Sequence, residues 1–172
     1  MKRTVTEKTP LHRFLQWITV LCGGCTLLCA AGFFAPMCTL SLYASFPSDN
    51  SLTVSAYRLA SGVGIGTWQI EKPIFYLFLI LPLAAACFTL LSGVLPRGIG
   101  QAAVLVCGAL QITVLVAVKQ LFTAWVSAYR AYVIVSWGWY AALCFAALFT
   151  LLALVALFAW ALLLSQPEKK DG

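Results

Sequence analysis

The chain has 172 residues, of which 62% are hydrophobic and only 9% are charged. A soluble domain of this length needs far more charge to cover its surface, so the composition excludes an ordinary soluble domain and indicates a membrane protein. The net charge of +6 does not indicate nucleic-acid binding, because the basic residues lie in the two tails and singly in connectors, without an aromatic-interleaved basic patch.

The first uncharged segment covers residues 14–35 and follows a basic tail over residues 1–13. As a helix this segment would be about 33 Å long, against about 30 Å for the hydrocarbon core of a bilayer. A cleaved signal peptide is the alternative, but its hydrophobic region would be only about 7–15 residues long. The length therefore favours an uncleaved first transmembrane helix.

The connector over residues 36–72 is too long to lack structure in a compact protein. Polar and apolar residues alternate over 39–43 and again over 51–57, with a turn-rich segment at 47–50 between them. Such alternation is typical of strands that bury one face. We therefore expect two short antiparallel strands in this outer loop.

The second and third spans are predicted to form a helical hairpin. The second covers residues 73–95 and has Pro82 near its middle, where we expect a kink. Residues 96–98 make a tight turn into a third span over 99–118. Such a short link makes the two spans antiparallel neighbours.

The segment over residues 119–136 is polar on one side. One helical face would hold four residues spaced four, four and three apart: Lys119, Thr123, Ser127 and Arg130. We expect either an amphipathic extension of span three or a helix in the membrane interface, followed by a candidate third strand at 132–135. A fourth span over 137–164 begins with aromatic residues typical of a membrane boundary and precedes a polar tail at 165–172.

Lysine and arginine positions predict the orientation. With the amino terminus inside, the cytoplasmic side holds Lys2, Arg3, Lys8, Arg13, Arg97, Lys169 and Lys170, and the outer side holds Arg58, Lys72, Lys119 and Arg130. The positive-inside rule then favours both termini in the cytoplasm and a location in the cell membrane. The predicted fold is a single all-α membrane domain over 1–172, a four-transmembrane-helix bundle with a small antiparallel β-sheet formed by the outer loops.

The four predicted spans contain no Asp, Glu, Lys, Arg or His. A charge near the bilayer centre costs about 2.5–3.5 kcal/mol on insertion scales, so proteins keep one there mainly for a purpose. Its absence argues against a stand-alone ion-coupled carrier. The sequence also has no paired carboxylates, no nucleophile–base pair and no P-loop. We expect no enzymatic activity, no cofactor and no metal site.

Cys22, Cys25 and Cys29 share one face of the first span with Gly32. A redox or metal site would need accessible thiolates and, for a metal, usually four ligands. The pattern therefore favours a strip of small residues that lets another helix approach closely. Six of the seven cysteines lie inside apolar runs, which is not the pattern of a disulfide-rich domain.

Gln111 lies in the middle of the third span. A polar side chain there usually hydrogen-bonds to a neighbouring helix, for about 1–2 kcal/mol at most. The alternative is a ligand site between helices near Gln111 and Pro82. On the outer side, Arg58, Lys119 and Arg130 are candidates for contact with an anion or a partner, or for snorkelling anchors.

Two segments carry a resemblance, Ser-Ala-Tyr-Arg-Leu-Ala-Ser-Gly at 55–62 and Gly-Trp-Tyr-Ala-Ala-Leu at 138–143. With them the chain resembles a loose class of uncharacterised small bacterial four-span membrane proteins, which have a strand-bearing first outer loop and a glycine-aromatic start to the last span. The plan is also similar to that of claudin-like proteins, although the claudin signature of Trp-Gly-Leu-Trp followed by two loop cysteines is absent. The resemblance implies a fold and no activity.

These patterns predict a non-enzymatic interaction or assembly subunit. Its partners would be the lipid bilayer and another membrane protein or a second copy, and no nucleic acid. One alternative is a component of a transporter or channel that binds a small or lipidic ligand between helices. A cysteine-dependent redox membrane enzyme is a third hypothesis, which rests on Cys22, Cys25 and Cys29.

Overall fold

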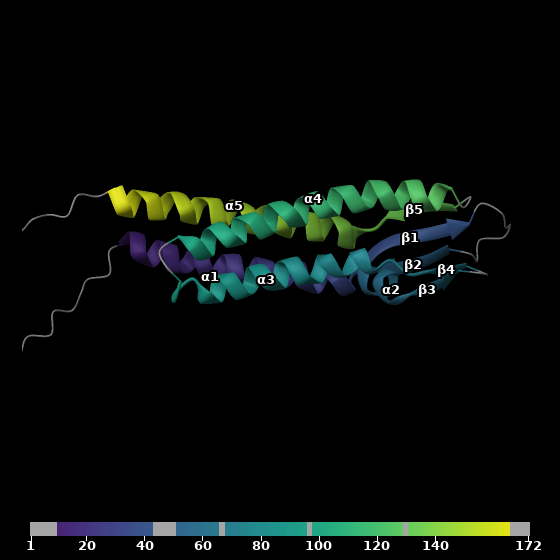
Figure 1. Ribbon diagram of the computed structural model, residues 1–172, viewed down its shortest axis with the longest axis horizontal. Helices are drawn as coiled ribbons and strands as arrows, with labels where there is room; N and C mark the ends of the chain where they lie inside the picture. Colours follow the sequence, from purple (N-terminus) through teal and green to yellow (C-terminus); the bar gives the residue numbers. More distant parts are fainter. Residues whose placement is uncertain (1–9, 43–50, 66–67, 96–97, 129–130, 166–172) are drawn as a thin grey trace, which may run out of the picture.

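The computed structural model describes residues 10–42, 51–65, 68–95, 98–128 and 131–165. Long helices lie side by side as an elongated bundle, and short strands gather at one end of it (Figure 1). We call this the sheet end. The opposite end, where the first helix begins and the last helix ends, is called the terminal end (Figure 1).

The bundle consists of α1 (Pro10–Ala31), α3 (Leu77–Leu91), α4 (Ile99–Ser127) and α5 (Trp137–Ser165). Short 3-10 turns follow α1 and precede α3, namely η1 (Gly32–Phe34) and η2 (Pro73–Tyr76). Four segments are long and apolar enough to cross a membrane: Arg13–Phe34, Pro73–Leu91, Ile99–Ser127 and Trp137–Leu162. The chain is a multi-pass membrane protein, and the predicted four-helix bundle is confirmed.

Some helix ends differ from the predicted spans. The helix of the first span begins at Pro10, and α3 ends at Leu91, four residues short of the expected boundary at residue 95. The larger difference is α4, whose 29 residues continue to Ser127. At about 43 Å it is longer than the hydrocarbon core, because no glycine or proline interrupts residues 109–127. The amphipathic segment is therefore an extension of span three, not a separate interfacial helix.

The four helices pack in a ring in the order α1, α3, α4, α5. Small residues occupy the contact lines. A Cβ added at Gly32 would lie 3.6 Å from the Cβ of Ala142 on α5, and one added at Gly100 would lie 3.0 Å from the Cα of Ser92 at the end of α3. Lipid tails supply no hydrophobic force between helices, so close van der Waals packing has to hold such a bundle together.

The sheet end carries a three-stranded antiparallel sheet of β1 (Pro36–Leu42), β2 (Ser51–Ser55) and β5 (Ala131–Val135), in the order β2-β1-β5. Leu40 lies opposite Leu52 and Val133, and Thr39 lies opposite Thr53 and Ile134. The leucine face continues the core of the bundle, and the threonine face points away from it. The predicted strands, including the candidate third strand, are confirmed.

One helix and one hairpin at the sheet end were not predicted. Residues 51–57 were expected to stay extended, but the strand ends at Ser55, whose hydroxyl accepts a hydrogen bond from the backbone N–H of Arg58 at 3.4 Å and caps α2 (Ala56–Ser61). Gly62, with φ of +105°, ends that helix. A second hairpin of β3 (Val63–Ile65) and β4 (Trp68–Ile70) then leads to η2.

Gly108 marks the closest approach of α4 and α5. A Cβ there would overlap the Oγ1 of Thr150 and would lie 2.8 Å from the ring of Phe149. We expect Gly108→Ala to lower the free energy of unfolding in detergent micelles by about 1–3 kcal/mol, because two rigid helices would have to separate. The matched control is Gly24→Ala on α1, where nothing lies within 4 Å of the added atom. Equal stabilities of the two variants would contradict this packing.

Candidate functional site

The polar centre of the bundle lies at Gln111. Its side chain is fully buried on α4, and its Nε2 donates towards the Sγ of Cys29 on α1 at 4.0 Å. The thiol of Cys29 in turn donates to the backbone carbonyl of Ala142 on α5 at 3.5 Å. Sulfur is a weak donor and a weak acceptor. These two contacts therefore link three helices through polar groups without making a strong bond.

The Oε1 of Gln111 has no hydrogen-bond partner in the described part of the chain. A buried acceptor without a partner costs about 1–3 kcal/mol. The polar contact of Gln111 goes to α1, as expected of a side chain that bonds to a neighbouring helix, and the ligand site between Gln111 and Pro82 stays a prediction. Pro82 is buried inside α3, where its missing N–H leaves the carbonyl of Phe78 without its usual helical donor.

The small-residue strip of α1 faces α5. Cys22 donates to the carbonyl of Phe149 at 3.6 Å, Cys29 reaches Ala142, and Gly32 lies against the same alanine. Cys25 is buried between them, and all seven cysteines are free. Two of the three thiols thus donate to the α5 backbone, which is the arrangement of a packing contact. No group of three or more His, Cys, Asp or Glu residues that could hold a metal occurs in the described ranges.

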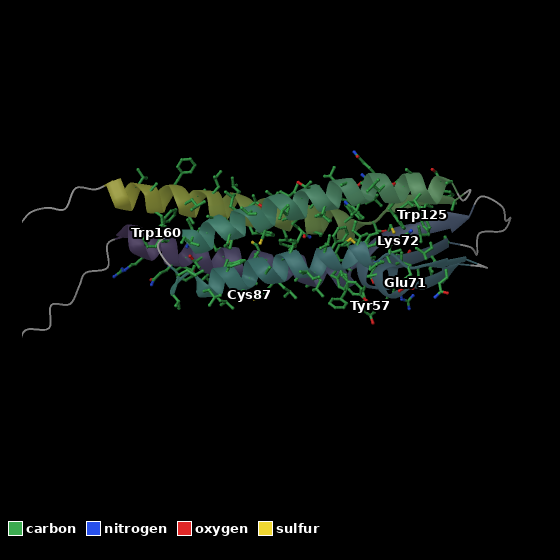
Figure 2. All side chains as sticks on the ribbon, viewed as in Figure 1. Tyr57, Glu71, Lys72, Cys87, Trp125 and Trp160 are labelled. Carbon is green, nitrogen blue, oxygen red and sulfur yellow. The ribbon has the colours of Figure 1, made fainter. Side chains whose placement is uncertain are left out.

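Two of the three candidate outer-face cations are described, and they lie on different elements. Arg58 is exposed on α2 and Lys119 is exposed on α4, while Arg130 lies outside the described residues. A different cation has a defined position. The Nζ of Lys72 lies 4.2 Å from the centroid of the Trp125 ring, and the two residues lie close together at the sheet end (Figure 2). Such a cation–π contact contributes about 0.5–2 kcal/mol, depending on its solvation.

An apolar groove of about 320 Å³ lies beside this pair, between η2 and α4. Its lining comprises Lys72, Ile74, Phe75, Val118, Leu121, Phe122 and Trp125. The ring centroids of Phe75 and Phe122 are 5.4 Å apart in an edge-to-face arrangement, which fixes η2 against α4. Sequence reasoning did not find this groove, because nothing in either segment indicates that residues near 72 and near 125 come together.

Aromatic side chains lie at both ends of the bundle. At the sheet end, Phe34 and Tyr57 are exposed, and their ring centroids are 5.8 Å apart. At the terminal end Trp17 is 70% exposed, and Trp160 lies at the same end (Figure 2). Trp17 and Phe34 are separated by about 26 Å of helix, close to the thickness of a hydrocarbon core. These aromatic residues fit the two membrane boundaries.

Comparisons with known proteins do not add a family to this picture. No family model matches the chain, and no curated protein and no solved structure matches it.

Cys38 is the cysteine outside the membrane spans, and it lies on the buried face of β1 between Val54 and Val135. Burial raises the pKa of its thiol to about 12. The thiolate is the reactive form, so the folded protein should keep Cys38 protonated and unmodified by a maleimide from about pH 7 to 9, and denatured protein should react. Peptide mass spectrometry would measure the modification. A Thr53→Cys variant on the exposed face should react when folded, and equal labelling of both positions would refute the assignment.

Proposed function

We propose that the chain is a non-enzymatic membrane subunit that acts by assembly, through the exposed face and edges of its β2-β1-β5 sheet. The observation that carries this proposal is Ile134, which is 54% exposed on the face that points away from the core. It lies outside the candidate membrane span that begins at Trp137. Tyr132, two residues earlier on the same face of β5, is 40% exposed, and contiguous exposed apolar surface of this kind marks interaction sites.

The sheet is held firmly enough to serve as a contact surface. The backbone N–H of Ser136 donates to the carbonyl of Met37 at 2.9 Å, which fixes the start of α5 to β1. Gly138 lies so close to Pro36 that an added Cβ would overlap the proline carbonyl oxygen. Leu40 and Val54 fill the core below the strands. A partner would therefore meet a preformed surface, which lowers the ordering cost of association.

The sheet edges suggest what the partner offers. Among the described residues, β2 and β5 each pair with β1 along one side. The other side of an edge strand presents backbone N–H and C=O groups that can accept an added strand. An extended segment of another membrane protein, or β5 of a second copy, has the required chemistry.

The packing of the described bundle favours assembly over transport through one chain. Phe33, Phe78, Leu115 and Phe149 are all at most 1% exposed, and they fill the space between the helices. A cavity between the helices near the terminal end holds about 10 Å³, roughly the room of one water molecule. Solute passage along this axis would require the helices to separate.

The assembly proposal predicts a specific effect at Ile134. We expect Ile134→Lys to abolish co-purification of a partner, or self-association, in mild detergent, because a charge would have to be desolvated in the contact. The matched control is Gln69→Lys, which adds the same charge at an exposed position on β4, in the other hairpin. Chemical crosslinking in membranes, followed by size analysis in detergent, measures the assembly. A wild-type chain that is strictly monomeric without a specific partner would refute the proposal.

We further propose that the protein lies in the cell membrane with both termini in the cytoplasm. Seven basic residues against four support this orientation. A reporter that is active only in the cytoplasm should function when fused after Gly172 and fail when inserted near Asp49, which lies outside the described residues. The opposite result would reverse the orientation and put the sheet in the cytoplasm.

A further inference from the structure

The terminal end of the bundle contains a groove of about 570 Å³. Its lining comes from α1, from the end of α3, from α4 and from α5, and consists of Leu15, Gln16, Thr19, Val20, Ser92, Gly93, Gln101 and Trp160. A cavity of about 10 Å³ lies further in and shares Thr19, Ser92 and Gln101 with the groove. The volume lies in the range of about 300–1,000 Å³ that is usual for small-ligand sites.

Gln101 is the buried polar residue of this groove. Its side chain is 8% exposed and lines both the groove and the inner cavity. Within the described ranges its amide has no hydrogen-bond partner. The amide atoms are not fully enclosed, because Gln111 Oε1 is the one buried unpartnered side-chain atom among the described residues, so the Gln101 amide keeps surface that a ligand in the groove can reach. Gln101 therefore offers two N–H donors and one acceptor to whatever occupies the groove.

The hydroxyl groups around Gln101 offer acceptors. Thr19 donates its proton to the carbonyl of Leu15 at 2.9 Å, and Ser92 donates its proton to the carbonyl of Thr89 at 2.6 Å. A hydroxyl has one proton and two lone pairs, so both oxygens can still accept but not donate. A group that satisfies these two hydroxyls must donate hydrogen bonds, while the Gln101 amide can meet a donor or an acceptor.

The charge of that group follows from the described lining residues, none of which has an acidic or basic side chain. A bare ammonium group would be desolvated without a carboxylate to offset its charge, and an anion would face the lone pairs of the two hydroxyls. A neutral hydroxyl group avoids both costs. The chemistry therefore fits an uncharged, hydroxylated ligand.

The position of the groove indicates that the rest of this ligand is apolar. Val20 is exposed and belongs to the span Arg13–Phe34, and Trp160 lies at the terminal end of α5 (Figure 2). We propose that the groove binds the uncharged, hydroxylated headgroup of a membrane lipid, with its acyl chains in the surrounding bilayer. This inference is independent of the proposed assembly at the sheet end.

The test compares two neutral lipids with identical acyl chains, a glucosyl diacylglycerol and a phosphatidylcholine, whose headgroup donates no hydrogen bond. Native mass spectrometry of the full chain in detergent should show about tenfold tighter binding of the glucosyl lipid, since one or two hydrogen bonds are gained. Gln101→Leu should remove that preference. Thr19→Val, which keeps the shape of the side chain and removes the acceptor, should also reduce the preference for the glucosyl lipid. This second variant keeps the test available if Gln101→Leu does not fold. The control Gln120→Leu, at an exposed position near the other end of α4, should retain it.

Three results would overturn the proposal. One is equal binding of the two lipids by the wild-type chain. Another is an undiminished preference in both groove variants. The third is a higher unfolding temperature when free methyl glucoside is added at the concentration used for the lipid. The ligand would then be a soluble sugar.

Discussion

The close approach of α1 and α4 to α5 is the constraint on which the rest of the structure depends. In lipid the helices gain nothing from leaving solvent, so their association relies on atoms in direct contact. Alanines on α5 and glycines on the facing helices are small enough to allow that direct contact. Ala142 receives both Gly32 and the thiol of Cys29, and Gly108 lies against Thr150. A larger residue at any of these positions would separate the helices that carry the sheet.

The position of the sheet follows from the same packing. β1 follows α1 through η1, and β5 directly precedes α5. Because α1 and α5 are neighbours, these two strands emerge side by side and can pair. β2 then adds to the free side of β1, and its apolar residues join the core of the bundle. The contact surface proposed at Ile134 is thus built on two helices that pack through small residues.

Much of the fold could be predicted from the sequence, because uncharged length and polar–apolar alternation are local signals. The four spans and all three strands of the larger sheet were found in this way. The capping role of Ser55 was missed, since alternation continues through residue 57 and hides the helix that begins at Ala56. The groove beside Lys72 and the groove around Gln101 could not be predicted. Each groove is lined by segments that lie far apart in the chain. In the groove around Gln101, the hydrogen bonds open to a ligand also depend on the backbone carbonyls that Thr19 and Ser92 already donate to.

The connection of β1 and β5 to α1 and α5 has a mechanical consequence. A partner that pulls on the sheet transmits its load along two transmembrane helices at once. The load then acts in parallel on anchors that are buried in lipid and are joined through the contacts of Cys22 and Cys29 with the α5 backbone. Such an attachment resists extraction from the membrane better than a sheet suspended from one flexible linker.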